Sequence, residues 1–117
     1  MQVFVRGDVW LARWAKDTAE SEIKARPAVI ISNLDFNSKN EEVICLHLTT
    51  NLNHEYALSL DSKKDFAKCF LAEQSAIRYD IIARYSKKSL VKKLGILKNE
   101  TLNQAVAKTI GLIKGKR

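Results

Sequence analysis

The stretch "KARPAVIISN", residues 24–33, gives the strongest indication of the fold. Four apolar residues follow Pro27 without a break, and such a run predicts a strand that is buried on both faces and lies centrally in a sheet. Pro27 fixes its own φ and favours extended backbone at Arg26, so we expect the arginine at the start of this strand. A guanidinium held there suits a phosphate or carboxylate ligand, and an ion pair with a nearby acid is the alternative.

Short apolar segments on both sides of this stretch predict further strands. Residues 8–14 alternate, with Trp10 and Trp14 on one face, which is typical of a strand. Residues 15–25 are polar and charged and predict an exposed loop, while residues 33–40 are rich in turn-forming residues. The other segments expected to form strands are residues 42–50, 55–61, 68–72 and 75–85.

The C-terminal part of the chain predicts helices. Residues 86–95 fit a short helix that begins after Ser86 and ends at Gly95. A longer helix is expected to begin at Asn99 and to end at Gly115. Its apolar residues at helical spacing, expected to face the core, are Leu102, Val106, Ile110 and Ile113. The order of elements predicts a mainly β (α+β) class, a small β-barrel or curled sheet carrying a C-terminal helix, as a single domain over residues 1–117.

Composition and charge narrow the function. The 117 residues carry a net charge of +7, and this excess favours polyanionic partners, a solubilising surface being the alternative. The densest basic pairs are Lys63-Lys64, Lys87-Lys88 and Lys92-Lys93. No apolar run is long enough to span a membrane and the first residues lack a signal-peptide core, so we expect a cytoplasmic protein without membrane contact. The two cysteines, Cys45 and Cys69, fit no metal-ligand spacing; we expect free thiols and no metal or other cofactor.

Five motifs in one order resemble a known family. They are "RGDVW" (6–10), "RPAVIISN" (26–33), "LTTN" (48–51), "SAIRYD" (75–80) and "SLVKKLGIL" (89–97). Together they resemble the MazF/PemK family of toxin endoribonucleases, or mRNA interferases, over nearly the whole chain, in the manner of its divergent members.

The resemblance implies a fold, an activity and partners. It implies an SH3-like β-barrel with added helices, a homodimer, and cleavage of single-stranded RNA without a metal. It also implies a cognate antitoxin whose acidic or apolar tail covers the RNA groove, with any DNA binding made through that antitoxin. Carried over by motif, Arg26 and Thr49 act on the scissile phosphate. This chemistry is reasonable because RNA supplies its own nucleophile, the 2′-hydroxyl, so the products are a 2′,3′-cyclic phosphate and a 5′-hydroxyl.

Other candidate residues follow from these assignments. His47 lies two residues before Thr49, so both should share a strand face, and its usual pKa suits proton transfer; a structural hydrogen bond is the alternative. Glu20 and Glu22, in the loop before Arg26, are further candidates for proton transfer. The candidate RNA-binding residues are Thr50, Arg78, Arg84, Lys24 and Lys87.

Several departures from the family pattern keep other functions open. The loop before Arg26 lacks the family's glycines, and Ile81 and Ala83 stand where glutamine and arginine are common. Trp10 and Trp14 could stack on bases, or pack in the core or a dimer contact. One alternative function is a CcdB-like toxin that poisons DNA gyrase without being an enzyme. Another is an RNA-binding barrel with little or no catalysis.

Overall fold

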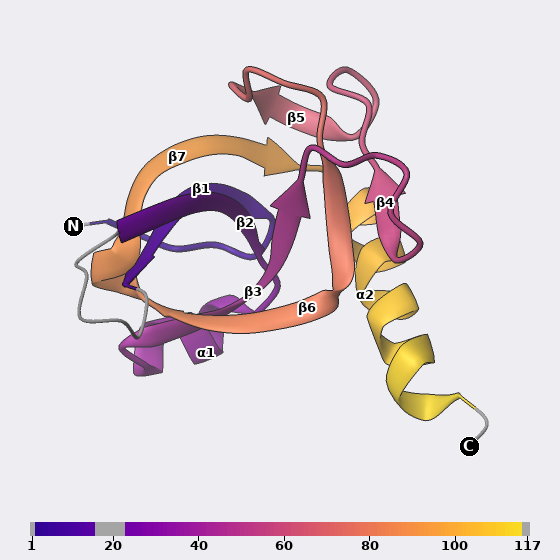
Figure 1. Cartoon of the computed structure of the whole chain (residues 1–117). Coiled ribbons are helices and arrows are strands. Elements are labelled where there is room, and N and C mark those ends of the chain that lie inside the picture. The colour runs from indigo at the N-terminus through magenta and orange to yellow at the C-terminus, as the bar shows by residue number, and fades with distance from the viewer. Residues whose placement is uncertain (1, 16–22, 116–117) are drawn as a thin grey trace.

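The computed structural model describes residues 2–15 and 23–115, which form one antiparallel sheet flanked by helices (Figure 1). Its seven strands lie in the order β4-β6-β3-β2-β1-β7-β5. The strands are β1 (Asp8–Ala15), β2 (Ile23–Ile30), β3 (Glu42–Thr49), β4 (Ala57–Ser59), β5 (Phe66–Cys69), β6 (Ala76–Ser86) and β7 (Leu90–Leu97). The helices are α1 (Leu34–Lys39), the short 3-10 helix η1 (Lys87–Ser89) and α2 (Asn99–Lys114).

The sheet curls strongly but does not close, so the prediction of a closed barrel is wrong while that of a mainly β curled sheet is confirmed. β6 and β7 flank the three central strands, and η1 connects them around one end of the sheet (Figure 1). The outermost strands, β4 and β5, have three and four residues and do not pair with each other in the described part of the chain. Such short edge strands leave the ladder open.

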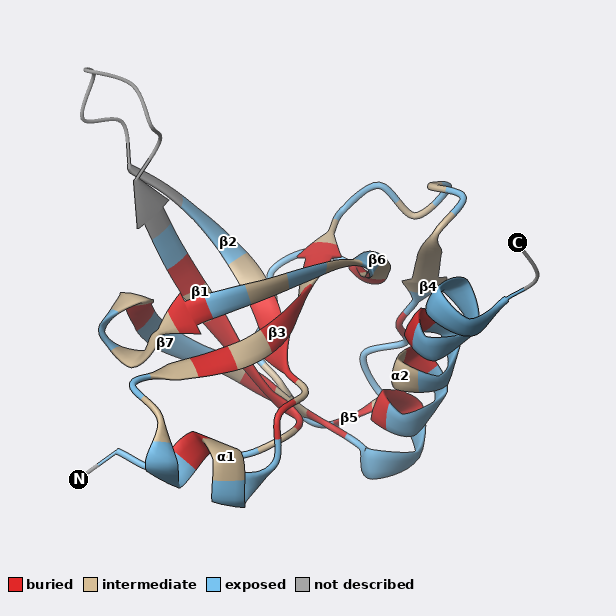
Figure 2. Ribbon diagram, turned by 90° about the horizontal axis from the view of Figure 1, so that it is seen from below, coloured by how far each residue is buried: buried red, intermediate tan, exposed pale blue. Residues whose placement is uncertain are grey.

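Side chains on both faces of the sheet are buried in two separate cores. Val9 belongs to the core beneath α2, while its neighbour Trp10 belongs to the core on the opposite face. Val29 and Ile30 of β2 likewise point to opposite faces, and both are fully buried. The predicted central strand is therefore confirmed, and buried residues concentrate in β1, β2 and β3 (Figure 2).

The C-terminal helix forms as predicted but packs through a different face. Thr101, Ala105 and Thr109 recur at intervals of four residues and are buried against the sheet side, together with Leu102. Small side chains allow the helix to approach closely, and the Thr109 hydroxyl donates to the carbonyl oxygen of Tyr79 at 2.7 Å. The predicted core residues Ile110 and Ile113 are instead exposed.

Two segments adopt structures that the sequence patterns did not predict. Residues 34–39 form α1 because the Asn33 side chain accepts from the backbone N–H of Phe36 and caps the helix. Ser86 does cap a helical turn, but that turn ends after three residues and the chain continues as β7, paired with β1. Gly95 does not end a helix: a Cβ there would lie 2.6 Å from the Lys68 carbonyl oxygen, so glycine permits β5 to pack beside β7.

Candidate active site

The candidate site lies where β2 and β3 separate. The two strands pair through Ala28 and His47, and the described pairing goes no further toward the start of β2. The same register, continued by two residues, sets Arg26 across from Thr49. A cavity of about 300 Å³ occupies this position. Its lining residues are Ala25, Arg26, Pro27, Leu48, Thr49, Thr50 and Ser75.

The polar side chains described in this cavity are one guanidinium and three hydroxyls. Arg26 is exposed and Thr49 is half-buried, so both reach solvent through the opening. The Thr49 oxygen accepts from the backbone N–H of Asn51 at 3.1 Å, which leaves its hydroxyl hydrogen able to donate elsewhere. A cation beside hydroxyl donors is a suitable environment for a phosphate group.

His47 forms a close pair with Tyr85 beside this cavity. The Tyr85 hydroxyl lies 2.6 Å from His47 Nε2, and the two rings stack with their centroids 5.7 Å apart. Burial lowers the pKa of His47, and the positive charges of Arg26 and Arg78 lower it further. Burial raises the pKa of Tyr85, while the Arg26 charge opposes that rise. A neutral imidazole and a neutral phenol therefore lie within the electrostatic reach of Arg26.

Sequence reasoning missed Tyr85 because no local pattern connects it with His47. Their contact depends on the register between β3 and β6, which shifts next to His47. Leu46 pairs with Ile82 whereas His47 pairs with Arg78, so residues 79–81 are extra residues on β6. This irregularity agrees with the predicted bend in the strand over residues 75–85. It is a tertiary feature that strand alternation does not reveal.

The other candidate RNA-binding side chains do not all gather at the cavity. Arg78 pairs with His47 across the sheet, and its guanidinium donates twice to the Asp80 carboxylate, at 2.8 Å each. Arg84 forms an ion pair with Glu42 at 3.2 Å.

Arg84 and Lys87 lie away from the site. Arg84 pairs with Ile44, five residues before Thr49 and hence about 16 Å along β3. Lys87 lines a different cavity, together with Phe4 and Asn37 among others. The proton-transfer candidates Glu20 and Glu22, and the side chain of Lys24, lie outside the described part of the chain.

The remaining sequence candidates have packing roles. Trp10 is buried, with its ring centroid 5.0 Å from that of Phe4, which agrees with core packing and leaves no face for base stacking. The Trp14 side chain lies outside the described residues. Ala83 pairs with Cys45 and packs against the second core, so the departure at this position fills space in the interior.

Two searches of the described residues gave no site of another class. They contain no group of three or more histidine, cysteine, aspartate or glutamate side chains placed to hold a metal ion. Among the same residues, no helix has the length and apolar character needed to cross a membrane. Cys45 and Cys69 are free thiols, as predicted.

An open curled sheet with a cationic, hydroxyl-lined cavity is a fold and site of toxin type, and the family comparison agrees. Residues 5–113 match the PemK-like, MazF-like toxins of type II toxin–antitoxin systems. The chain therefore belongs to this family of toxins, whose characterised structures include endoribonucleases. No curated protein sequence matches the chain significantly.

Solved structures of the same fold cover almost the whole chain. An endoribonuclease in complex with its cognate antitoxin from a mycobacterial species is 24% identical, with a TM-score of 0.68 over 95% of this chain and 96% of that one. A chain of the MazE–MazF complex from Deinococcus radiodurans is 14% identical, with a TM-score of 0.80 over 99% and 100%. The Mycobacterium tuberculosis toxin MazF-mt6 is 20% identical, with a TM-score of 0.65 over 90% and 93%.

Proposed function

We propose that this toxin is an endoribonuclease that cuts single-stranded RNA by attack of a 2′-hydroxyl on the adjacent phosphate. The observation that carries the proposal is the cavity between β2 and β3, where Arg26 and Thr49 approach from opposite strands. The 2′-oxygen forms a bond to phosphorus and the bond from phosphorus to the 5′-oxygen breaks. The products are a 2′,3′-cyclic phosphate and a 5′-hydroxyl.

The two residues have distinct roles in this reaction. The Arg26 guanidinium donates to the non-bridging phosphate oxygens, whose negative charge grows in the transition state. The Thr49 hydroxyl donates to the same group from the other side and holds the phosphate in line for attack. Thr50, which lines the same cavity, offers a second hydroxyl to the RNA backbone.

His47 is our candidate for proton transfer. Its lowered pKa leaves the imidazole neutral near neutral pH, which is the form that accepts a proton from the attacking 2′-hydroxyl. The Tyr85 contact at Nε2 fixes the orientation of the ring. Glu20 and Glu22 remain alternatives from the sequence.

We propose two protein partners, a cognate antitoxin and a second copy of this chain. The net charge of +7 suits an acidic antitoxin tail that competes with RNA for the same cavity. Two proteins of this fold have been solved as complexes named for a cognate antitoxin or for MazE. The exposed side chains of Ile110 and Ile113 on α2 support further burial by another protein surface.

The test is cleavage of one sequence in three chemical forms, with the cut ends mapped. We expect RNA to be cut in excess EDTA, while the same sequence made as DNA, or as RNA with a 2′-O-methyl group at the cut site, stays intact. A cut that needs magnesium, or that occurs in the methylated strand, would contradict attack by the 2′-hydroxyl. Intact RNA under all conditions together with trapped gyrase would favour the CcdB-like alternative.

A further inference from the structure

A second cavity adjoins the candidate active site. Its volume is about 280 Å³, and Ser75 lines both this cavity and the one that contains Arg26 and Thr49. It is enclosed by the segments that precede and follow β5. Its lining residues are Leu60, Asp61, Ser62, Phe66, Cys69, Leu71, Ala72, Glu73, Gln74 and Ser75.

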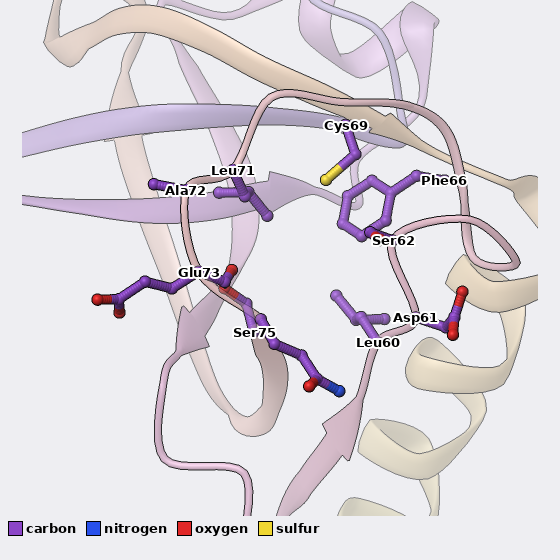
Figure 3. Close-up of a pocket in the computed structure, with 10 residues that line it drawn as sticks. Leu60, Asp61, Ser62, Phe66, Cys69, Leu71, Ala72, Glu73 and Ser75 are labelled. Atoms are coloured by element: carbon purple, nitrogen blue, oxygen red, sulfur yellow. The ribbon is translucent and has the colours of Figure 1, made fainter.

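The floor of this cavity is apolar and includes an aromatic ring. Leu60 and Phe66 are buried core residues, and Leu71 and Cys69 are half-buried beside them. Figure 3 shows these four side chains gathered around one space. The volume lies near the lower limit for small-molecule pockets, about 300 Å³, so the cavity suits one flat ring system and not a larger ligand.

The rim is polar, and part of it is not used within the protein. Ser75 donates its hydroxyl to the Glu73 carbonyl oxygen at 3.1 Å. The exposed side chains of Ser62, Glu73 and Gln74 form no hydrogen bond within the described part of the chain. Hydroxyl, carboxylate and amide groups above an apolar floor provide the donors and acceptors that recognise the edge of a nucleobase.

Cations flank the cavity on one side. The Asp61 carboxylate points away from the cavity (Figure 3) and accepts from the backbone N–H groups of Lys63 and Lys64, at 2.8 Å each. These bonds hold the turn that presents both exposed lysines beside the cavity. A base placed in the cavity would therefore have its phosphate near two positive charges, which favours RNA over an uncharged peptide side chain.

We propose that this cavity binds one nucleobase of the RNA strand, next to the nucleotide that is cut, and so contributes to sequence preference. The proposal rests on the proposed function in one respect, namely that RNA is the substrate. Phe66 and the leucines contact the face of the base, the polar rim contacts its edge, and the lysine pair contacts the backbone.

Cys69 provides a built-in reporter for this cavity. Its sulfur points into the space between Phe66 and Leu71 in Figure 3, and the residue is half-buried. Cys45 is fully buried, and burial raises its pKa to about 12, so it stays an inaccessible thiol. Iodoacetamide should therefore alkylate Cys69 selectively, which mass spectrometry of the peptides reads directly.

The experiment measures the alkylation rate of Cys69 with and without a bound, uncleavable strand. The probe is a mixed-sequence 2′-O-methyl oligoribonucleotide, and its binding is followed separately by fluorescence anisotropy. At about ten times its Kd, roughly nine-tenths of the protein is bound, so alkylation should slow about tenfold. The matched control is an abasic 2′-O-methyl strand of equal length and charge, which should bind through its phosphates and leave the rate unchanged.

The outcomes separate this inference from the proposed function. Unchanged alkylation with the base-bearing strand bound, or equal protection by the abasic strand, overturns the nucleobase assignment even if the protein cuts RNA. Protection by the base-bearing strand alone supports it even if no RNA is cut. Arg26→Ala should lose cleavage and keep the protection, because Arg26 does not line this cavity.

Discussion

Replacing Arg26 by alanine tests the proposed chemistry most directly. Arg26 is exposed at the opening of the cavity, and its neighbour Pro27 sets its backbone, so the substitution removes a side chain without opening a hole in either core. Exposed substitutions of this kind change the free energy of unfolding by about 0.5 kcal/mol or less. For a chain of this size we therefore expect a change in Tm of no more than about 3 °C.

The effect on catalysis should be far larger. A preorganised donor to a developing oxyanion contributes about 3–4 kcal/mol to the stabilisation of the transition state. Its removal should lower kcat for RNA cleavage by about 10²–10³-fold. Arg26→Lys keeps the charge but loses the planar pair of N–H donors, so we expect an intermediate loss of rate.

Arg84→Ala is the matched control, because it removes the same charge from the neighbouring part of the sheet. The Arg84 guanidinium pairs with Glu42 and lies 5.8 Å from the centroid of the Phe36 ring, away from the cavity. Initial rates on a fluorogenic single-stranded RNA, together with thermal melts, compare the variants. A folded Arg26→Ala protein with a rate near that of the wild type refutes the assignment. Equal losses in both variants would mean that Arg26 merely attracts RNA by its charge.

Three further predictions follow from other parts of the structure. Thr49→Ala should slow cleavage by about tenfold or more, and Thr49→Ser should recover most of the rate, whereas a Thr50→Ala variant slower than Thr49→Ala would exchange their roles. Gly95→Ala should lower the Tm because its Cβ would lie 2.6 Å from a backbone oxygen, while Gly111→Ala, which meets no atom within 4 Å in mid-helix, should raise it by up to about 1 kcal/mol of stability. The pKa of His47 is lowered on folding, so its contribution to stability is complete above about pH 6.5 and is lost as the pH falls below that value; urea unfolding between about pH 7 and 5 should show a steeper loss in wild type than in His47→Gln, and equal slopes would contradict the shift.

The parts of the fold that the sequence predicted well are those decided by local pattern. Residues 28–30 are apolar without interruption, and such a run fits a central strand because both faces need burial. The strand over residues 42–49 and the C-terminal helix were recognised for similar reasons. Arg26 and Thr49 were identified as partners by resemblance, and the structure places them at one cavity.

The parts that were predicted wrongly depend on contacts between distant segments. Leu90–Leu97 has a pattern that fits a helix, but pairing with β1 selects a strand. Apolar residues alone suggested that Ile110 and Ile113 face the core, yet the Thr109 hydrogen bond to Tyr79 selects another face of α2. Asparagine signals a turn in residues 33–40, but it also caps helices, and only the structure shows that Asn33 does so.

The cavity itself results from a single constraint that is visible in the sequence but whose consequence is not. Proline has no N–H to donate to a ladder and is therefore rare within a central strand. Pro27 lies in β2, and the pairing of β2 with β3 ends one residue after it, at Ala28. Beyond that point the two strands no longer share hydrogen bonds in the described part of the chain, so space opens between Arg26 and Thr49. The residue that sets the arginine's backbone is thus also placed where the sheet divides, and we infer that this division makes room for a phosphate between two strands that would otherwise be paired.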